Sequence, residues 1–219
     1  MSIDLQKVLP LKPRFAFFKK IALLFIGVSF FLALEQIYYY FFFDSFGYED
    51  EEIFGIVHLI SSLINLALSV LFTVLLARMS YFSYYNAIGK LSEHSFQFKP
   101  GFAAGYWFIP ILLLYRPFHV LKDTESAIRE RTGRPSIDWQ INLLWLIYLA
   151  YLFLAQRVMY HQIFGNSRPP SGLETAYEAM SFFARIIMVG YLLAIYGMFQ
   201  EQLDSMPIPE SAENNEHKG

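Results

Sequence analysis

The stretch FKPGFAAGYWFIPILLLYRPFHV, residues 98–120, decides how this chain is arranged in a membrane. It is strongly apolar, but it opens on Pro-Gly, carries a proline in its middle and ends on Arg-Pro. A helix over residues 101–115 would be about 22 Å long, whereas the hydrocarbon core of a bilayer is about 30 Å thick. We therefore expect a short, proline-broken helix that either enters the membrane and returns or lies at its interface.

The composition of the whole chain is that of a membrane protein. Of 219 residues, 55% are hydrophobic and only 16% are charged, whereas soluble domains have about 25% charged residues. The basic residues are spread between apolar segments, which argues against nucleic-acid binding. The absence of cysteine excludes disulfides, thiolate metal sites and cysteine nucleophiles.

Four longer apolar segments, at about residues 21–43, 53–77, 136–160 and 175–199, are each typical of a transmembrane helix. Residues 117–133 alternate apolar and charged side chains at helical spacing, which predicts an amphipathic helix on the cytoplasmic surface. The predicted fold class is an all-α membrane protein with four transmembrane helices, the proline-broken helix and the amphipathic helix. The predicted regions are a basic cytoplasmic N-terminus (1–20), a single membrane domain (21–199) and a disordered acidic tail (200–219).

The distribution of basic residues favours four crossings over five. If residues 101–115 crossed the membrane, a basic cluster would lie outside, against the rule that short cytoplasmic loops hold the Lys and Arg. This cluster consists of Arg116, Lys122, Arg129, Arg131 and Arg134. With four crossings the cluster stays inside, and both termini of this multi-pass protein are expected in the cytoplasm.

Small and polar side chains recur at four-residue spacing in the second apolar segment, at Ser61, Asn65, Ser69 and Thr73. They fall on one helix face, and lipid gains nothing from such a face. We interpret this stripe as a helix-packing surface. A polar pathway lined by the same residues is the alternative.

Five ionisable residues lie within the apolar segments and form a candidate intramembrane polar cluster: Glu35, His58, Arg157, Glu178 and Arg185. A charge at the bilayer centre is costly, so Arg185 needs a partner or water. We expect that partner to be Glu35, with Glu178 second. The pair is either a structural lock or part of a polar cavity for a small anion or for protons. Because no two of the His and Glu residues stand in one helix at zinc-ligand spacing, we predict no metal site.

The central stretch also resembles a known family. Its glycines, prolines and Trp-Phe-Ile-Pro sequence, followed by Arg-Pro, are similar to the signature of the domain-of-unknown-function 4328 family of small bacterial integral membrane proteins. The residues that carry the resemblance are Pro100, Gly101, Gly105, Trp107, Pro110, Arg116 and Pro117. The resemblance implies a multi-pass protein of the bacterial inner membrane, and it implies no activity.

No nucleophile motif, phosphate-binding glycine loop or dinucleotide fingerprint occurs in the sequence, so we predict no catalytic residues, no cofactor and no enzyme activity. The favoured function is a binding or partner-organising accessory protein of the membrane. The alternative is a small transporter or channel-like protein. The expected partners are the lipid bilayer and a protein at the cytoplasmic face, and the sequence also allows a homo-oligomer.

Overall fold

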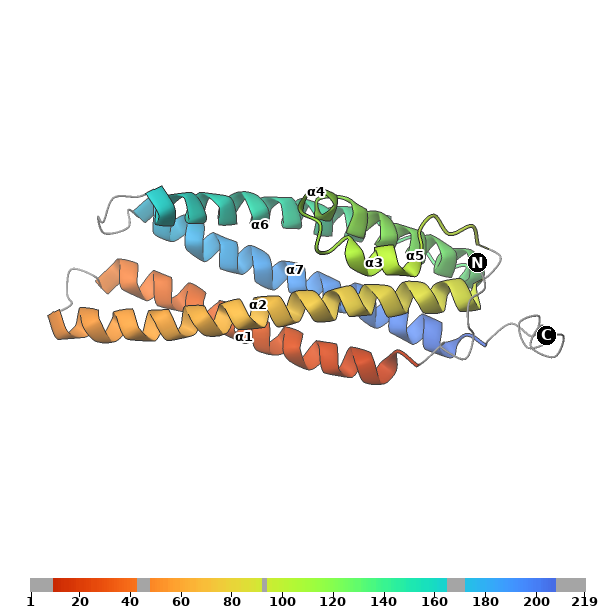
Figure 1. The fold of residues 1–219 in the computed structure, drawn as a ribbon, viewed down its shortest axis with the longest axis horizontal. Helices are drawn as coiled ribbons and strands as arrows, with labels where there is room; N and C mark the ends of the chain where they lie inside the picture. Colours follow the sequence, from red (N-terminus) through yellow and green to blue (C-terminus); the bar gives the residue numbers. More distant parts are fainter. Residues whose placement is uncertain (1–9, 43–47, 92–93, 165–171, 208–219) are drawn as a thin grey trace. The chain divides into compact units, whose positions relative to one another are not determined.

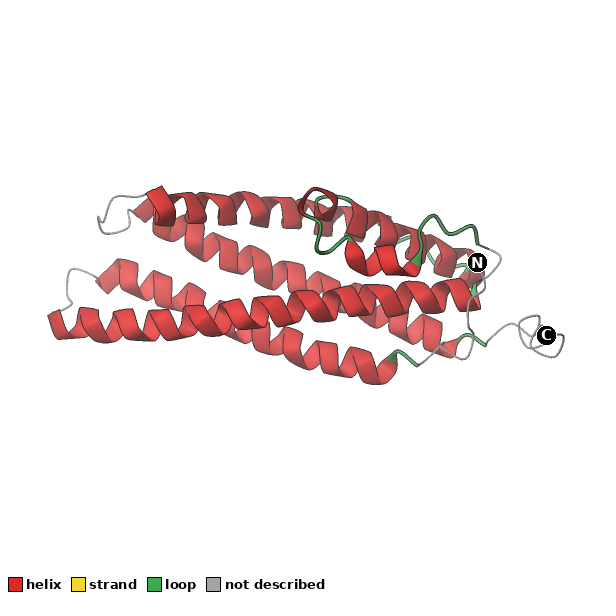
Figure 2. Ribbon diagram, in the orientation of Figure 1, coloured by secondary structure: helices red, strands yellow, loops and turns green. Residues whose placement is uncertain are grey.

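The structure, a computed structural model, describes residues 10–42, 48–91, 94–164 and 172–207. Within these ranges all regular structure is helical (Figure 2). Four helices are long and three are short, and Figure 1 labels them in chain order. They are α1 (Lys12–Phe42), α2 (Tyr48–Lys90), α3 (Pro100–Gly105), α4 (Pro110–Leu113), α5 (Arg116–Thr132), α6 (Asp138–Phe164) and α7 (Gly172–Ser205).

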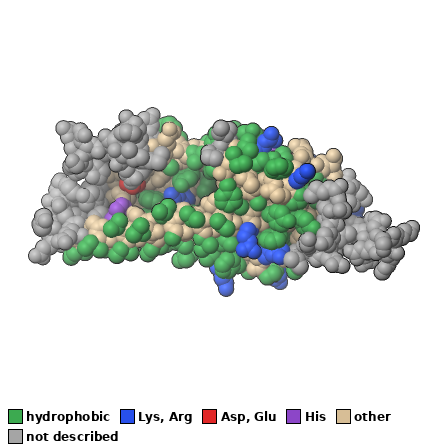
Figure 3. All heavy atoms as spheres, viewed as in Figure 1, with side chains coloured by type: hydrophobic (Ala, Val, Ile, Leu, Met, Phe, Trp, Pro, Cys, Tyr) green, Lys and Arg blue, Asp and Glu red, His purple; other side chains and the backbone are tan. Residues whose placement is uncertain are grey.

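The four long helices are long and apolar enough to cross a membrane, which confirms the four predicted spans and a multi-pass membrane protein. The candidate spans are Lys12–Tyr38, Gly55–Lys90, Asp138–Gln156 and Thr175–Ser205. Large hydrophobic side chains remain exposed on them, as is expected of surfaces that face lipid rather than water. On α2, for example, Leu59, Leu63 and Leu66 are about 60% exposed, and Figure 3 shows hydrophobic side chains over much of the visible face.

The described residues divide into two compact units. The single membrane domain over residues 21–199 stays a prediction. Unit 1 is drawn from Met1–Lys19, Thr73–Leu143 and Leu192–Gly219, and unit 2 from Lys20–Phe72 and Leu144–Tyr191. The long helices continue from one unit into the other, so each helix packs in two separate sets of neighbours.

In unit 1 the core joins α2, α3 and α5. Tyr84, Ala103 and Val120 pack together, one from each of these helices, and the partly buried rings of Phe96 and Phe98 cover them. In unit 2, Leu32 and Ala33 of α1 pack against Phe182 of α7. In unit 1, the large Tyr84 side chain of α2 thus packs against the short helix α3.

α1 and α7 extend beyond their predicted ends, and a distant residue contacts each of these ends. α1 begins at Lys12 rather than Ile21, and the Asp204 carboxylate accepts hydrogen bonds from the backbone N–H groups of Leu11 and Lys12, both at 2.9 Å. α7 continues to Ser205, and Lys90 Nζ donates to the Leu203 carbonyl at 2.5 Å. Residues 12–20 and 200–205 are thus helical, and residues 208–219 of the predicted tail lie outside the described ranges.

Proline begins each of the short helices. Pro100 opens α3, Pro110 opens α4 and Pro117 stands in the first turn of α5, positions at which the missing N–H costs nothing. At 6 and 4 residues, α3 and α4 are far shorter than the roughly 20 residues that span a bilayer. α5 ends at Gly133, whose φ of 67° is the left-handed conformation that favours glycine.

Candidate functional site

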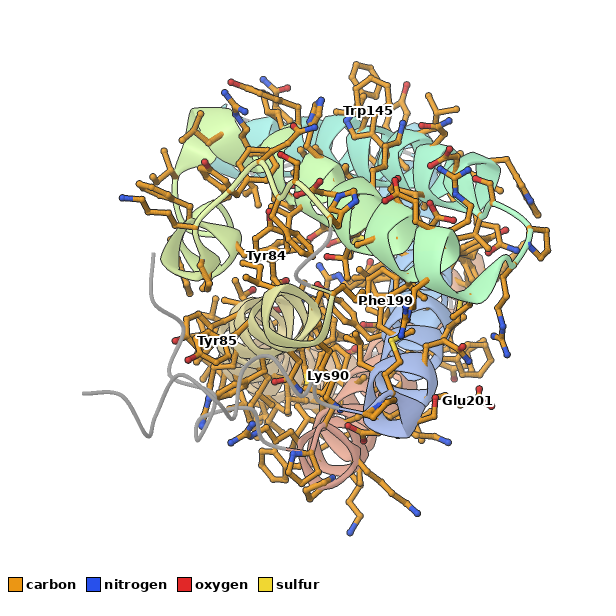
Figure 4. The ribbon with its side chains drawn as sticks, turned by 90° about the vertical axis from the view of Figure 1, so that its right-hand side faces the viewer. Tyr84, Tyr85, Lys90, Trp145, Phe199 and Glu201 are labelled. Carbon is orange, nitrogen blue, oxygen red and sulfur yellow. The ribbon has the colours of Figure 1, made fainter. Side chains whose placement is uncertain are left out.

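A buried polar network in unit 1 fixes the linker between α2 and α3. Tyr84 of α2 is fully buried, and its hydroxyl donates to Asp123 Oδ2 at 2.5 Å and accepts the Phe98 N–H at 2.9 Å. Asp123 Oδ2 also accepts the Gln97 N–H at 3.1 Å. In Figure 4, Tyr84 points from α2 toward α5. One phenol and one carboxylate therefore tie the linker to both helices.

His94 extends this network to the exposed end of α5. Its Nδ1 lies 2.7 Å from Glu130 Oε2 and its Nε2 lies 3.2 Å from Asp123 Oδ1. Burial lowers the pKa of His94, but the hydrogen bonds to the two carboxylates outweigh it, so that the pKa of His94 is raised. The same hydrogen bond lowers the pKa of Glu130. We call Tyr84, His94, Asp123 and Glu130 the linker network.

Trp107 joins the central stretch to α2. It is buried, its Nε1–H donates to Ser80 Oγ at 2.7 Å, and the Ser80 hydroxyl is also hydrogen-bonded to Tyr196 of α7. Arg116 lies among aromatic rings instead, with its guanidinium carbon 5.3 to 5.9 Å from the ring centres of Tyr115, Phe98 and Tyr106. In the family-like motif, Trp107 therefore holds the central stretch by a hydrogen bond, whereas Arg116 does so by contacts with aromatic rings.

Glycines four residues apart, as in that motif, can allow helices to pack closely, but Gly101 and Gly105 do not serve this purpose in the structure. A Cβ added at Gly101 or Gly105 would meet nothing within 4 Å, because neither backbone approaches another element. Gly190 of α7 is equally open. A close approach occurs at Gly197, where a Cβ would lie 3.2 Å from the Phe15 ring.

In unit 2, part of the predicted intramembrane cluster comes together around Glu35. This buried carboxylate lies 3.4 Å from His58 Nδ1, and its other oxygen accepts a hydrogen bond from Ser61 at 3.4 Å. Glu178 of α7 interacts electrostatically with both Glu35 and His58. The side chain of Arg157, the fifth predicted member, lies outside the described part of the chain.

Arg185 does not pair with Glu35, so that prediction is wrong. Its Nη1 donates to Asn65 Oδ1 at 2.8 Å and its Nη2 donates to the Tyr151 hydroxyl at 3.1 Å. Three ring centres, those of Phe25, Tyr151 and Phe182, lie 5.3 Å from its guanidinium carbon. Its Nε is buried and has no hydrogen-bond partner among the residues that the structure describes. Arg185 stands two turns, about 10 Å, beyond Glu178 on α7, and there the neighbouring helices offer an amide and a phenol.

The polar stripe of α2 meets these same side chains. Ser61 contacts Glu35, Asn65 contacts Arg185, and the Ser69 hydroxyl donates to the Asn65 carbonyl at 2.7 Å. Thr73, the last of the stripe, is half-buried. In unit 2 the stripe therefore lies toward the other helices, while leucines on the opposite side of α2 are exposed.

Sequence reasoning missed the linker network and placed Asp123 and Glu125 on the polar side of the amphipathic helix. Both are buried. Glu125 Oε1 accepts the Ile137 N–H at 3.2 Å, and burial raises the pKa of Glu125 against the lowering effect of that bond. The spacing contained a signal for Glu125, because it stands four residues after Leu121 and three before Ile128 on the apolar face. Asp123 had a similar signal, because it stands three residues after Val120 and four before Ala127, which are both apolar and buried.

Within the described ranges, no group of three or more His, Asp or Glu side chains is placed to hold a metal ion. In the linker network and at the Arg185 site, the polar side chains instead contact other protein groups. The linker network pairs each of its groups with another, whereas the Arg185 site retains a buried N–H that has no acceptor in the described part of the chain. The Arg185 site therefore leaves a hydrogen bond that a ligand can make.

Comparison with known families agrees with this architecture. The sequence model of a domain of unknown function, DUF4328, matches residues 48–201, from the start of α2 to near the end of α7. Comparison with curated proteins and with solved structures found no match. The matched range contains the whole central stretch with its glycines, prolines, tryptophan and arginine, and it covers well over half of the 219 residues. The chain therefore belongs to the DUF4328 family, as the motif predicted.

Proposed function

We propose that this protein acts in the bacterial inner membrane through binding and not through catalysis, as an accessory protein that holds a partner at its cytoplasmic face. The observation that carries the proposal is the linker network. It directs the polar groups on the inner side of α5 into contacts with α2 and the linker, and so holds the helix in place. A surface that is held in one conformation loses less entropy when a partner binds.

The outer side of α5 supplies the binding surface in this proposal. Phe118, Leu121 and Ile128 face inward and are buried. The outward residues are polar or charged and at least partly exposed: His119, Lys122, Ser126, Glu130 and Arg131. Such a mixed charged surface suits a protein partner or a second copy of the chain better than it suits a small molecule.

The membrane arrangement follows from the short helices. In our proposal α3 and α4 lie at the cytoplasmic interface without crossing, and α5 lies on the surface beside them. Exposed apolar side chains support this placement, since Phe102 and Phe108 are more than half exposed and Ile109 nearly so. With four crossings both termini are cytoplasmic, and the basic residues of α5 stay on the inner side.

A photo-crosslinking experiment tests the binding surface. A photoreactive amino acid at Ser126 should give a discrete protein adduct in cells, and the charge reversal Lys122→Glu should abolish it. The same group at Leu63, on the exposed apolar side of α2, is the control and should give lipid adducts only. An adduct of twice the chain's mass would identify a second copy as the partner. Matching adducts at both positions, or none at Ser126, would contradict the proposal.

The second candidate function is transport, and the Arg185 site favours it. Among the described residues this guanidinium has only neutral hydrogen-bond partners, and its Nε lacks an acceptor, as expected of a site that takes up an anion. Chloride flux into proteoliposomes should then be lost in Arg185→Leu and retained in Lys122→Gln. If the wild-type protein carries no chloride beyond the level of empty liposomes, anion transport through this site is ruled out for chloride.

A further inference from the structure

A second site lies in unit 1, between the start of α1 and the middle of α2. A cavity of about 250 Å³ is lined there by apolar side chains, among them Phe17, Leu75 and Met79, and by two cations, Arg14 and Arg78. Phe17 is 52% exposed and Arg78 is exposed, so the cavity adjoins the outer surface of these helices. It shares no residue with the linker network or with the outer side of α5.

The two arginines lack an anionic partner among the described residues. The guanidinium carbon of Arg14 lies 3.7 Å from the ring centre of Phe82, while its Nη1 is buried and has no hydrogen-bond acceptor within the described ranges. Arg14 and Arg78 also repel each other. The Asp204 carboxylate at the start of α1 accepts hydrogen bonds from the backbone N–H groups of Leu11 and Lys12. Two like charges and an unsatisfied donor beside one cavity are costly unless an anion joins them.

The walls of the cavity identify the kind of anion. A free phosphate gains nothing from Phe17, Leu75 and Met79, whereas a lipid offers a phosphate to the arginines and an acyl chain to the apolar walls. Arg78 directly follows the apolar run of α2 that ends at Ala77, which is where headgroups meet the helix. We infer that this cavity binds an anionic phospholipid, with Arg14 and Arg78 holding its phosphate group.

Native mass spectrometry of the protein released from nanodiscs tests this inference. With nanodiscs of mixed phosphatidylglycerol and phosphatidylcholine, the wild-type protein should retain phosphatidylglycerol selectively. The double variant Arg14→Gln/Arg78→Gln should lose about 30-fold in that preference, because each surface cation contributes about fivefold. The matched control Lys12→Gln/Lys20→Gln removes two exposed charges from α1 and should keep the preference.

Other outcomes overturn the inference. An equal loss in the lysine control would mean general attraction to anionic lipid, and retention in the arginine variant would mean that the cavity is not the site. Displacement of the lipid by millimolar inorganic phosphate would assign the arginines to a soluble anion. Arg78→Gln alone alters an exposed side chain and so preserves the fold. This single variant should lose about fivefold in its preference for phosphatidylglycerol. It keeps the test decisive if the double variant is unstable.

Discussion

At the scale of single residues, the Tyr84 hydroxyl holds the linker between α2 and α3 through two hydrogen bonds. It donates to Asp123 and accepts from the Phe98 N–H, so Tyr84→Phe leaves a carboxylate and a backbone amide each short of a partner. We expect this variant to lose about 2 kcal/mol of stability, the usual cost of a lost hydrogen bond to a charged group. Thermal unfolding in detergent measures it.

Tyr81→Phe is the matched control for this prediction. It removes a hydroxyl from a half-buried ring of the same helix and leaves the stacking of that ring on Tyr85, with centroids 5.8 Å apart. The unfolding midpoint should change much less than in Tyr84→Phe. Equal shifts in the two variants would show that the linker network adds no stability of its own.

The raised pKa of His94 predicts a dependence of stability on pH. A group whose pKa is raised in the folded state stabilises the fold fully below its ordinary pKa, about 6.5, and loses that effect as the pH rises through the raised value. Glu130, whose pKa is lowered, adds stability above its ordinary pKa, about 4.3, and loses it as the pH falls through the lowered value. The His94–Glu130 pair should therefore stabilise most between about pH 4.3 and 6.5.

Comparing wild type with His94→Gln over pH 5 to 9 isolates this effect. The difference in unfolding midpoint between the two proteins should be largest near pH 5 to 6 and should shrink toward pH 9. A difference that stays constant with pH would mean that His94 contributes only through packing, for example against the Phe96 ring at 4.8 Å.

The sequence predicted at this scale that Arg185 needs a partner, and it was wrong about which one. The cost of a buried charge follows from the residue type alone, whereas the partner depends on how the helices rotate about their axes. That rotation brings Asn65 and Tyr151, both neutral, to the guanidinium. The charges in the sequence made Glu35 the expected partner of Arg185, but the Glu35 carboxylate contacts His58 and Ser61 instead.

At the scale of secondary-structure elements, α1 depends on a cap supplied from almost the other end of the chain. Asp204→Ala removes the acceptor of two N-terminal amides of α1. We expect a loss of about 1 to 2 kcal/mol, as for other N-terminal caps. Hydrogen exchange at residues 11–16 should speed up accordingly.

Glu201→Ala provides the control for the Asp204 variant. Glu201 lies on the same helix, α7, and is exposed, as Figure 4 shows. Its removal should leave exchange in the first turns of α1 unchanged. Equal acceleration in both variants would mean that α7 as a whole, rather than the cap, protects the start of α1.

The C-terminal end of α5 depends on glycine in another way. Gly133 has a φ of 67°, and its N–H donates to the Arg129 carbonyl at 2.8 Å, so Gly133→Ala should cost about 1 kcal/mol in backbone strain. Gly101→Ala, where the added Cβ meets nothing within 4 Å, should cost no stability. The midpoints of thermal unfolding compare the two. If Gly133→Ala is as stable as Gly101→Ala, α5 can end there without a left-handed residue.

Helix ends that local signals determine could be predicted from the sequence. Pro117 and Gly133 bracket α5 as expected. The ends of α1 and α7 could not be predicted, because Asp204 and Lys90 hold them across most of the chain. Pro110 begins α4 rather than breaking a longer helix, since the chain already leaves the helical conformation after Gly105.

At the scale of the whole molecule, the hydropathy pattern was sufficient for the class and the number of spans. Four long apolar segments became four long apolar helices, and the family motif placed the chain in the DUF4328 family. The division into two units and the linker network were not predictable, because both arise from contacts between residues far apart in the sequence. The network brings together Tyr84, His94 and Asp123, none of which is unusual by itself.

If α3 and α4 do not cross the membrane, Ser95 and Ser126 lie on the same side of it. The chain has no native cysteine, so single cysteines at Ser95 and Ser126 can be labelled with a membrane-impermeant maleimide. A cysteine at Ser45, between the first two spans, reports the outer side. We expect labelling of Ser45 in intact cells, and of Ser95 and Ser126 only after permeabilisation. Labelling of Ser126 in intact cells would mean five crossings and would place the basic surface of α5 outside, contrary to the proposed cytoplasmic binding site.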